Sequence, residues 1–436
     1  MRSFRFVLLG GGLSSGYAAR EFVKRGLGPG QLCIVTAEDV VAYERPALSK
    51  GYLNPVNAAR LPGFHTCVGG GGPRQEPAWY AEHGVEYLTG ATVTSVDISS
   101  RRLVLDNGEE LTYTDKLIVA TGARPARLEE VGIPGWDLKG VYYLRDIKDA
   151  VEIQAGIAEC KARDGNALVI GAGYIAIEVA AGLCANGLHT TMVFPGGMLM
   201  DRMLPPEAAC FYENYYERKG IEMCWGQRVT RLLGSDGLLE GVELDDGRVV
   251  EASMVLAGIG ARINKELFVG QLDMSQGGIE VNGKFRTSHP DVYAVGDVAA
   301  FPLLRYGGYI QRQEHVTNAR ASAIHAVAAI MDPENTGDYD YLPFYYSRFF
   351  SLSWQFFGLN RGRGIMFGDQ DMEKFGLYFV EEGRIVGAFL EGGSAEEFGW
   401  MKAVALQRPV APHADDLVIK GLKYAQELAT KPSEAS

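Results

Sequence analysis

The sequence has few cysteines and histidines, and neither residue type has the spacing of a metal or disulfide site. Its six cysteines include no CxxC or CxxxxC pair, and its seven histidines show no ligand spacing. A disulfide framework and a zinc site are therefore excluded, and we expect no bound metal and reduced, mostly buried thiols. The cysteines are Cys33, Cys67, Cys160, Cys184, Cys210 and Cys224.

The chain also lacks an excess of basic residues and a convincing membrane span. Its 42 Lys and Arg against 54 Asp and Glu give a net charge of −12, which argues against nucleic acid or an anionic membrane as the main partner. Residues 168–188 are strongly apolar, but Glu178 and the glycine pattern favour strand, turn and helix. An early first strand and a C-terminal KPSEAS without a targeting tripeptide predict a cytoplasmic location.

Residues 5–22, RFVLLGGGLSSGYAAREF, have the pattern of a dinucleotide-binding turn. An apolar run ends on three glycines at 10–12, and a helical pattern follows. This arrangement places a pyrophosphate at a helix N-terminus. The next apolar run, 32–36, precedes Glu38, which is positioned to bind ribose hydroxyls. The competing interpretation is a generic glycine turn of an α/β domain.

A second such pattern makes the first an internal repeat. Residues 167–170 predict a buried strand, GAGYIA at 171–176 a turn, the residues from Glu178 onward a helix, and 190–194 the next strand. Each half also contains a hairpin with an acidic-glycine turn, at 106–108 and at 245–247. A similar apolar strand follows each hairpin, in LIVATGARP and in MVLAGIGAR. Residues 85–119 predict a short antiparallel hairpin that leads to a buried strand, 116–120.

The rest of the chain completes a multidomain α/β protein. Residues 51–84 form a long Gly- and Pro-rich excursion, interpreted either as functional or as plain surface. An apolar strand at 292–295 leads to Gly296 and Asp297, and a helix is expected over about 313–331.

Two dinucleotide domains indicate a flavin at one and a nicotinamide cofactor at the other. We predict two Rossmann-like domains and a smaller α+β C-terminal domain. The boundaries are 1–145 with 261–332 for the discontinuous FAD-binding domain, 146–260 for the NAD(P)H-binding domain, and 333–436 for the C-terminal domain.

The motif order GGG…E…ATG…GAGYIAIE…YAVGD resembles the FAD/NAD-linked disulfide-reductase superfamily, in which the aspartate of the GD motif, here Asp297, binds the flavin ribityl chain. Disulfide reductases carry a redox-active cysteine pair in the segment that corresponds to 43–53, YERPALSKGYL. No cysteine is present there, so a thiol relay beside the flavin is excluded. The segment resembles the branch that passes single electrons, with Arg45 and Lys50 near the flavin; the alternative is an ordinary solvated basic pair.

Within that branch the chain is most similar to the monodehydroascorbate reductase family. The similarity covers nearly the whole chain and includes NAARLPGFHTCVG, YLRDIKDA, FYENYYERKG, EHVTNAR and WQFFG. It implies that NADH gives a hydride to FAD, and that two electrons then pass singly to two monodehydroascorbate radicals. It implies no obligate protein partner, no nucleic acid and no membrane.

A small anionic radical requires a local cationic pocket in an acidic protein. The resemblance assigns Arg320 and Arg348, whose forked donors suit oxygen acceptors; the alternative is salt bridging within the protein. It places Tyr346 against the flavin and nicotinamide, although a core aromatic is an equal alternative. It places Glu314 and His315 near the nicotinamide–flavin contact, and His315 also fits a helix start without chemistry.

The expected cofactor contacts combine the fingerprints with this resemblance. For FAD they are Gly10, Gly11, Gly12, Ser14, Glu38, Arg45, Lys50, Val93, Arg145, Asp297 and Tyr346. For NAD(P)H they are Gly171, Gly173, Tyr174, Ile175, Glu178, Gly196, Arg202, Gly260, Glu314 and His315.

The chain departs from the family pattern after the strand that ends at Pro195. An acidic residue is expected there to bind the adenosine ribose, but positions 196 and 197 are both glycine, and Arg202 is retained. Because a carboxylate disfavours a 2′-phosphate, its loss predicts weaker discrimination against NADPH than is usual in the family. Ala176 replaces the third glycine of the second fingerprint, and we expect the turn to tolerate its single methyl group.

Two other functions compete with this interpretation. A ferredoxin-type reductase would pass electrons to a protein and would need a docking face for it, which the acidic balance does not favour. A partner-binding flavoprotein of the apoptosis-inducing type would have basic surfaces and extra targeting segments, and neither is visible in the sequence.

Overall fold

The computed structural model describes residues 1–67 and 73–430. Part of the predicted 51–84 excursion, residues 68–72, and the KPSEAS segment, 431–436, lie outside the described residues. The chain forms two compact units, each assembled from separate stretches. The first unit comprises Met1–Ala47, Ala59–Arg124 and Ala261–Tyr341, and the second comprises Leu48–Ala58, Pro125–Gly260 and Leu342–Ser436.

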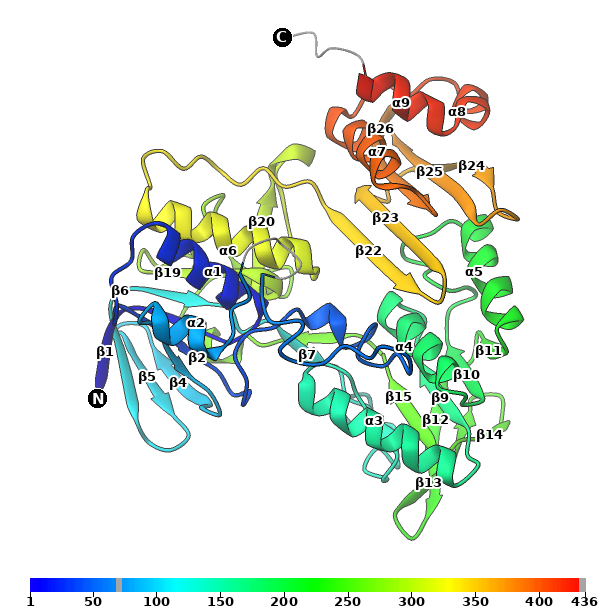
Figure 1. The fold of residues 1–436 in the computed structure, drawn as a ribbon, viewed down its shortest axis with the longest axis horizontal. Helices are drawn as coiled ribbons and strands as arrows, with labels where there is room; N and C mark the ends of the chain where they lie inside the picture. The colour runs from blue at the N-terminus through cyan, green and yellow to red at the C-terminus, as the bar shows by residue number, and fades with distance from the viewer. Residues whose placement is uncertain (68–72, 431–436) are drawn as a thin grey trace. The chain divides into compact units, whose positions relative to one another are not determined.

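The first unit is built on a mainly parallel sheet (Figure 1). Its strands are β1 Arg2–Leu9, β2 Leu32–Val35, β3 Glu86–Leu88, β4 Val93–Asp97, β5 Arg102–Leu105, β6 Glu110–Val119 and β19 Val292–Ala294. They lie in the order β3-β2-β1-β6-β5-β4, with β19 paired to β6. Side chains from Phe6 to Leu9 are at most 5% exposed, as expected for a parallel strand covered on both faces. The buried strands predicted at 6–9 and 32–36 are confirmed.

Strand β6 joins two features that the sequence presents separately. Its first half pairs antiparallel with β5, across the predicted turn at 106–108. Its second half pairs in parallel with both β1 and β19, with Leu117 opposite Val7 and Val292. The hairpin and the buried strand predicted at 116–120 therefore share one continuous strand. It pairs in parallel with β1 in both halves, and its other neighbour is β5 in the first half and β19 in the second.

Helices α1 (Leu13–Lys24) and α6 (Val316–Met331) pack against each other in the first unit. The helix predicted over 313–331 begins at Val316, three residues after the predicted start. His315 has an extended conformation and is the N-cap residue, with its Nδ1 accepting a hydrogen bond from the Thr317 amide.

Short elements complete the first unit. They are α2 Pro77–Glu82, η1 Arg45–Ala47, η3 Glu266–Phe268, η4 Gly296–Val298, η5 Leu304–Tyr306, β16 Ala261–Ile263, β17 Met274–Ser275, β18 Gly278–Glu280, β20 Ala299–Leu303 and β21 Tyr309–Gln311. Strand β7, Ala123–Pro125, spans the boundary between the units in the sequence.

The second unit repeats the strand–turn–helix arrangement on a parallel sheet. Its elements are β8 Val141–Tyr142, α3 Ile147–Ala162, β9 Ala167–Ile170, α4 Tyr174–Ala185, β10 Thr190–Phe194, α5 Pro206–Arg218, β11 Ile221–Trp225 and β15 Met254–Ala257, with η2 at Glu129–Val131. The strand order is β11-β10-β9-β15-β8. The predicted strands 167–170 and 190–194 are confirmed. Helix α4, predicted from Glu178 onward, begins at Tyr174, because Gly173 at the end of the turn is its N-cap residue.

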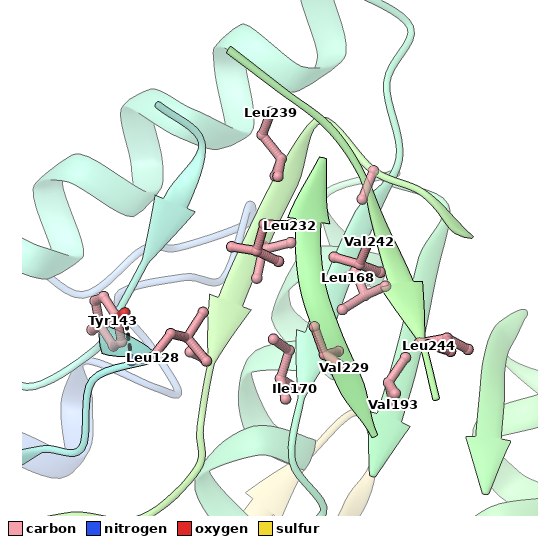
Figure 2. Close-up of a cluster of buried hydrophobic side chains, with 13 residues drawn as sticks. Leu128, Tyr143, Leu168, Ile170, Val193, Val229, Leu232, Leu239, Val242 and Leu244 are labelled. Carbon is pink, nitrogen blue, oxygen red and sulfur yellow. Dashed lines mark hydrogen bonds between the residues drawn. The ribbon is translucent and has the colours of Figure 1, made fainter. Parts of the chain in front are cut away.

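A hairpin sheet of β12 (Val229–Ser235), β13 (Leu238–Leu244) and β14 (Val249–Glu251) packs against this parallel sheet. Figure 2 shows the shared core, in which Leu232 and Val242 from the hairpins join Leu168 from β9. The Leu128 amide donates to the Tyr143 hydroxyl at its edge, at 3.0 Å. Hydrophobic burial therefore joins the hairpin sheet to the parallel sheet.

The C-terminal part of the second unit has an antiparallel sheet of order β22-β23-β26-β25-β24. Its elements are β22 Phe344–Phe349, β23 Leu352–Gly358, β24 Arg363–Asp369, β25 Lys374–Glu381, β26 Arg384–Glu391, α7 Ala395–Gln407, α8 Ala414–Lys420 and α9 Leu422–Thr430. Buried side chains of the strands and helices, among them Tyr378 and Met401, share one core. The predicted fold class is confirmed, and the three-domain division stays a prediction.

All six cysteines lie within the described residues and are free thiols. Cys33, Cys67 and Cys160 are buried, whereas Cys210 is exposed on α5. The expectation of mostly buried thiols therefore holds for only half of them. Residues 1–67 and 73–430 contain no cluster of His, Cys, Asp and Glu that would hold a metal ion. The helices of these same segments are too short or too polar to cross a membrane.

Candidate functional site

The first glycines of the two turns have similar backbone conformations and similar backbone contacts. Gly10 has φ +108°, and a Cβ there would lie 2.4 Å from the Ala120 carbonyl oxygen, just beyond β6. Gly171 has φ +127°, and a Cβ there would lie 2.3 Å from the Gly258 carbonyl oxygen, just beyond β15. Only glycine fits either position. The two sequence repeats therefore share one structural feature: the first glycine of each turn lies against a backbone carbonyl just beyond the end of an equivalent strand.

Both turns lead directly into helices whose N-termini suit an anion. Gly12 and Gly173 are the N-cap residues of α1 and α4. Within the described chain no side chain caps either helix, and neither first turn contains an acidic residue. Positive helix ends without a competing carboxylate are suited to a pyrophosphate. A Cβ is excluded at Gly10 and Gly171, and the helix N-termini that follow these two turns are open to an anion.

Ser14 and Asp297 are brought to the first turn by a close contact. Gly296 has φ +71°, and a Cβ on it would lie 2.7 Å from the Ser14 hydroxyl oxygen. The Gly296 amide donates to the Ser322 hydroxyl at 3.0 Å, which fixes this segment on α6. The structure thus gathers two predicted FAD contacts that are far apart in the sequence.

Glu38 forms a polar cluster with the 43–45 segment. It accepts hydrogen bonds from the Tyr43 hydroxyl at 2.7 Å and from Arg45 Nη2 at 2.6 Å. Arg45 Nη2 also lies 3.5 Å from the position of a Cβ on Gly12. The Tyr87 hydroxyl, which sequence reasoning missed, donates to the Gly11 carbonyl at 2.9 Å. Glu38 and Arg45 therefore lie close to the first turn, and their contact with FAD stays a prediction.

Arg320 is held by a buried acid in the first unit. Its Nη2 donates to Glu44 Oε2 at 2.5 Å, and its guanidinium lies over the Tyr17 ring at 5.6 Å. The Tyr17 hydroxyl donates to Glu44 Oε1 at 2.9 Å, and burial followed by the Glu44 charge raises the pKa of Tyr17. The alternative assignment of Arg320 to a salt bridge thus describes this structure. Glu44 and Tyr17 were missed because their partner is far away in the sequence.

Glu314 and His315 both have protein partners near the start of α6. Arg312 Nη1 donates to Glu314 at 2.5 Å and to the Asp297 carbonyl at 3.3 Å. His315 acts as the N-cap of α6, which is the structural role that the sequence also permitted. The Arg312 contacts tie Glu314 to the Asp297 segment, and the His315 contact lies in the first turn of α6.

Glu178 is the centre of a buried network in the second unit. Its carboxylate, 2% exposed, accepts hydrogen bonds from Ser49 at 2.5 Å, from Lys50 at 2.9 Å and from Ser347. Lys50 also lies 5.7 Å from the centre of the Tyr346 ring. The network thus joins the 48–58 segment, α4 and β22, and it brings together three predicted contacts, Lys50, Glu178 and Tyr346. Ser49 and Ser347 were not predicted.

Arg348 differs from Arg320 in its surroundings. It is exposed on β22, two residues beyond the half-buried Tyr346, and alternation along the strand places both on one face. Its side chain makes no hydrogen bond or ion pair with the residues that the structure describes. Arg348 is therefore available to bind an anion.

The remaining residues predicted to contact a cofactor lie on several different elements. Val93 is buried at the start of β4 opposite Leu105, and the Arg145 amide donates to Asp149 at 2.7 Å. Gly260 has φ +116° beyond β15. Tyr174 and Ile175 begin α4, and Gly196 and Arg202 follow β10.

The fold and its paired turns place the chain in the pyridine nucleotide-disulphide oxidoreductase class, whose family profile matches residues 4–323. The profile described as "Monodehydroascorbate reductase 3-like, C-terminal domain" matches residues 342–425. Among solved structures, a ferredoxin reductase from Rhodopseudomonas palustris has a TM-score of 0.84 at 26% identity, over 97% of this chain and 99% of that one. The covalent putidaredoxin reductase–putidaredoxin complex has a TM-score of 0.86 at 26% identity, over 99% of each chain.

Curated relatives are closer in sequence. "Monodehydroascorbate reductase 2, peroxisomal" of Oryza sativa subsp. japonica is 48% identical, over 99% of this chain and 90% of its own length. "Monodehydroascorbate reductase" of Pisum sativum is 45% identical, over 98% of this chain and 100% of its own length. The chain belongs to the monodehydroascorbate reductase family.

Proposed function

We propose that this chain reduces the monodehydroascorbate radical to ascorbate with NADH, through bound FAD. Two radical anions, one NADH and one proton give two ascorbate anions and NAD⁺. A bound flavin supplies the chemistry that joins hydride donation to single-electron transfer. The observation that carries the proposal is the pair of matching glycine turns, combined with the cysteine-free 43–53 segment and the family membership.

The residues of the first unit fit FAD. Gly10 to Gly12 would hold its pyrophosphate against α1, and Ser14 lies within the same turn. Glu38 would accept hydrogen bonds from the adenosine ribose hydroxyls, with Arg45 fixing its carboxylate. Asp297 would bind the ribityl chain. The second unit would hold NADH in the same manner at Gly171 to Gly173.

The residues assigned to the radical are Arg320 and Arg348. The substrate is a small anion, so a guanidinium provides both charge and paired donors. Arg348 is exposed and has no carboxylate partner among the described residues, so it can bind substrate oxygens without first breaking a salt bridge. Glu44 orients Arg320. We assign Tyr346, Glu314 and His315 to positioning, because hydride and electron transfer depend mainly on alignment.

The two competing functions receive less support. The solved ferredoxin-type reductases are 26% identical, whereas the rice relative is 48% identical across nearly the same length. The net charge of −12 does not favour docking of an acidic electron carrier. A partner-binding flavoprotein would not need an exposed arginine beside an aromatic on a sheet face. We therefore propose no obligate protein partner.

Steady-state kinetics test the proposed reaction. NADH oxidation is followed while ascorbate oxidase generates the radical, and then with a plant-type ferredoxin in its place. We expect rapid NADH oxidation that requires the radical and no protein acceptor. Turnover only with the ferredoxin would favour the first alternative, and no turnover with any small acceptor would favour the second.

The cytoplasmic location is likewise a proposal. Relatives from rice and Arabidopsis thaliana are named peroxisomal, whereas the pea relative's name gives no compartment. Fluorescent fusions at either end, compared with peroxisomal and cytosolic markers, test it. A punctate signal that overlaps the peroxisomal marker would contradict the proposal.

A further inference from the structure

Position 196 has no acidic side chain, but a carboxylate from another position in the sequence lies beside it. Gly196 follows β10, where an α/β dinucleotide domain places its ribose-binding carboxylate. Its φ lies outside the left-handed region, so the backbone would permit any side chain. However, a Cβ built on Gly196 would lie 2.9 Å from Asp201 Oδ2. The carboxylate of Asp201 therefore occupies the space into which a side chain at 196 would extend.

The segment that carries Asp201 is anchored to the nucleotide turn. The Met200 amide donates to the Ala172 carbonyl, inside the glycine turn, at 3.0 Å. The Leu199 amide donates to Glu213 Oε1 at 2.8 Å. Leu199 is 0% and Met200 is 5% exposed, and Met200 has the left-handed φ of +51°. Two buried anchors and a reversal of the backbone thus direct the next residue, Asp201, back toward Gly196.

The Asp201 side chain is available to a ligand. It is exposed, and its carboxylate accepts no hydrogen bond and makes no ion pair with the residues described here. The neighbouring Arg202 is also exposed. One acceptor group and one cation therefore lie together at the end of β10, beside the turn that would hold a pyrophosphate.

We propose that Asp201 supplies the ribose-binding carboxylate that position 196 lacks, and that it makes the enzyme selective for NADH over NADPH. The proposal rests on the proposed function, because it assigns a specificity role within the same nicotinamide site. The carboxylate accepts hydrogen bonds from the ribose hydroxyls of NADH and repels the 2′-phosphate of NADPH. It revises the sequence-based expectation of weak discrimination, which assumed that no carboxylate lies beside Gly196.

Binding of the oxidised nucleotides tests this role without relying on turnover. Dissociation constants of NAD⁺ and NADP⁺ are measured by titration calorimetry on the flavin-loaded protein. We expect the wild type to prefer NAD⁺ by at least about tenfold, and Asp201→Asn to reduce that preference by about tenfold, mostly through tighter NADP⁺ binding. Asp236→Asn, at an exposed hairpin turn of the same unit, is the matched control and should keep the ratio within about twofold.

A second variant moves the carboxylate back to the strand end. Gly196→Glu combined with Asp201→Gly removes the steric conflict and restores an acid after Pro195. We expect it to recover the wild-type preference to within about threefold.

Three results separate the failures. An Asp201→Asn ratio within about twofold of wild type, or a wild type that binds both nucleotides equally, would overturn the role of Asp201 while leaving the proposed function intact. A wild type that binds neither nucleotide would overturn the proposed function together with this inference.

Discussion

Arg320 and Arg348 carry the same charge in different settings. Arg320 shares a hydrogen-bonded network with Glu44, whereas Arg348 is exposed on β22 and has no carboxylate partner among the described residues. A guanidinium that is bonded to a carboxylate has a fixed orientation, but its charge is largely neutralised. A guanidinium without a carboxylate partner attracts an anion with its full charge. We therefore assign most of the charge-dependent recognition of the radical to Arg348.

Arg348→Ala should weaken binding of the radical specifically. A charge-assisted hydrogen bond contributes about 1.5–3 kcal/mol, so the KM for the radical should rise by about tenfold or more. NADH-dependent reduction of ferricyanide should change little, because it does not require this contact. Arg363→Ala, an exposed arginine on β24 of the same sheet, is the control. An unchanged KM in Arg348→Ala would show that this arginine does not bind the substrate.

Glu391 is a buried acid that the proposed chemistry does not use. Its Oε1 accepts the Ser353 and Gly392 amides at 2.8 and 2.9 Å, and its Oε2 accepts the Tyr212 hydroxyl at 2.8 Å. Burial raises the pKa of Glu391 from 4.5 to about 7. Because the raised pKa favours the protonated form in the folded state, its contribution is full at low pH and is lost as the pH rises from about 4.5 to 7.

Glu391→Gln should remove this pH dependence while keeping three hydrogen bonds. Its amide oxygen accepts the two backbone amides, and its NH2 group donates to the Tyr212 hydroxyl, which then accepts. The variant should match wild type in thermal stability near pH 4.5 and exceed it above pH 7, by at most about 3 kcal/mol. Thermal denaturation across this pH range provides the measurement. A constant difference at every pH would contradict the assigned pKa.

At the scale of elements, much of the fold was predictable because the signals are local. A buried parallel strand is a continuous apolar run, and a glycine turn with a helix after it has a short fingerprint. Strands 167–170 and 190–194 were therefore located correctly. The limits of β6 were not, because its pattern changes from alternating to continuous where the parallel strand β19 replaces the antiparallel strand β5 as its second neighbour.

Alanine at the first glycine of each turn should separate the two nucleotide sites. Both positions have a left-handed φ, and the added methyl would meet a carbonyl oxygen at 2.4 Å for Gly10 and 2.3 Å for Gly171. We expect Gly10→Ala to purify with little FAD, and Gly171→Ala to retain FAD but bind NAD⁺ at least about tenfold more weakly.

Absorbance measures the flavin content of these variants, and calorimetry measures their nucleotide affinity. Gly399→Ala, on α7 where a methyl meets no neighbour, is the control for folding. Full FAD in the Gly10 variant, or normal NAD⁺ binding in the Gly171 variant, would contradict these assignments.

At the scale of the whole molecule, the contacts that escaped prediction join distant parts of the chain. Glu44 and Arg320 are 276 positions apart, and Lys50 and Glu178 are 128 positions apart. No local pattern encodes such pairs, because they depend on how the elements of each unit are placed. Asp201 was missed for a different reason: its position depends on a left-handed residue, Met200, that no turn motif predicts.

The central claim is that this protein joins hydride donation by NADH to single-electron reduction of a small radical. An anaerobic absorption titration tests it most directly. We predict that about one equivalent of NADH bleaches the flavin band, and that about two equivalents of monodehydroascorbate radical restore it with release of two ascorbates, without a protein acceptor. A flavin that NADH bleaches but the radical leaves reduced would contradict the account.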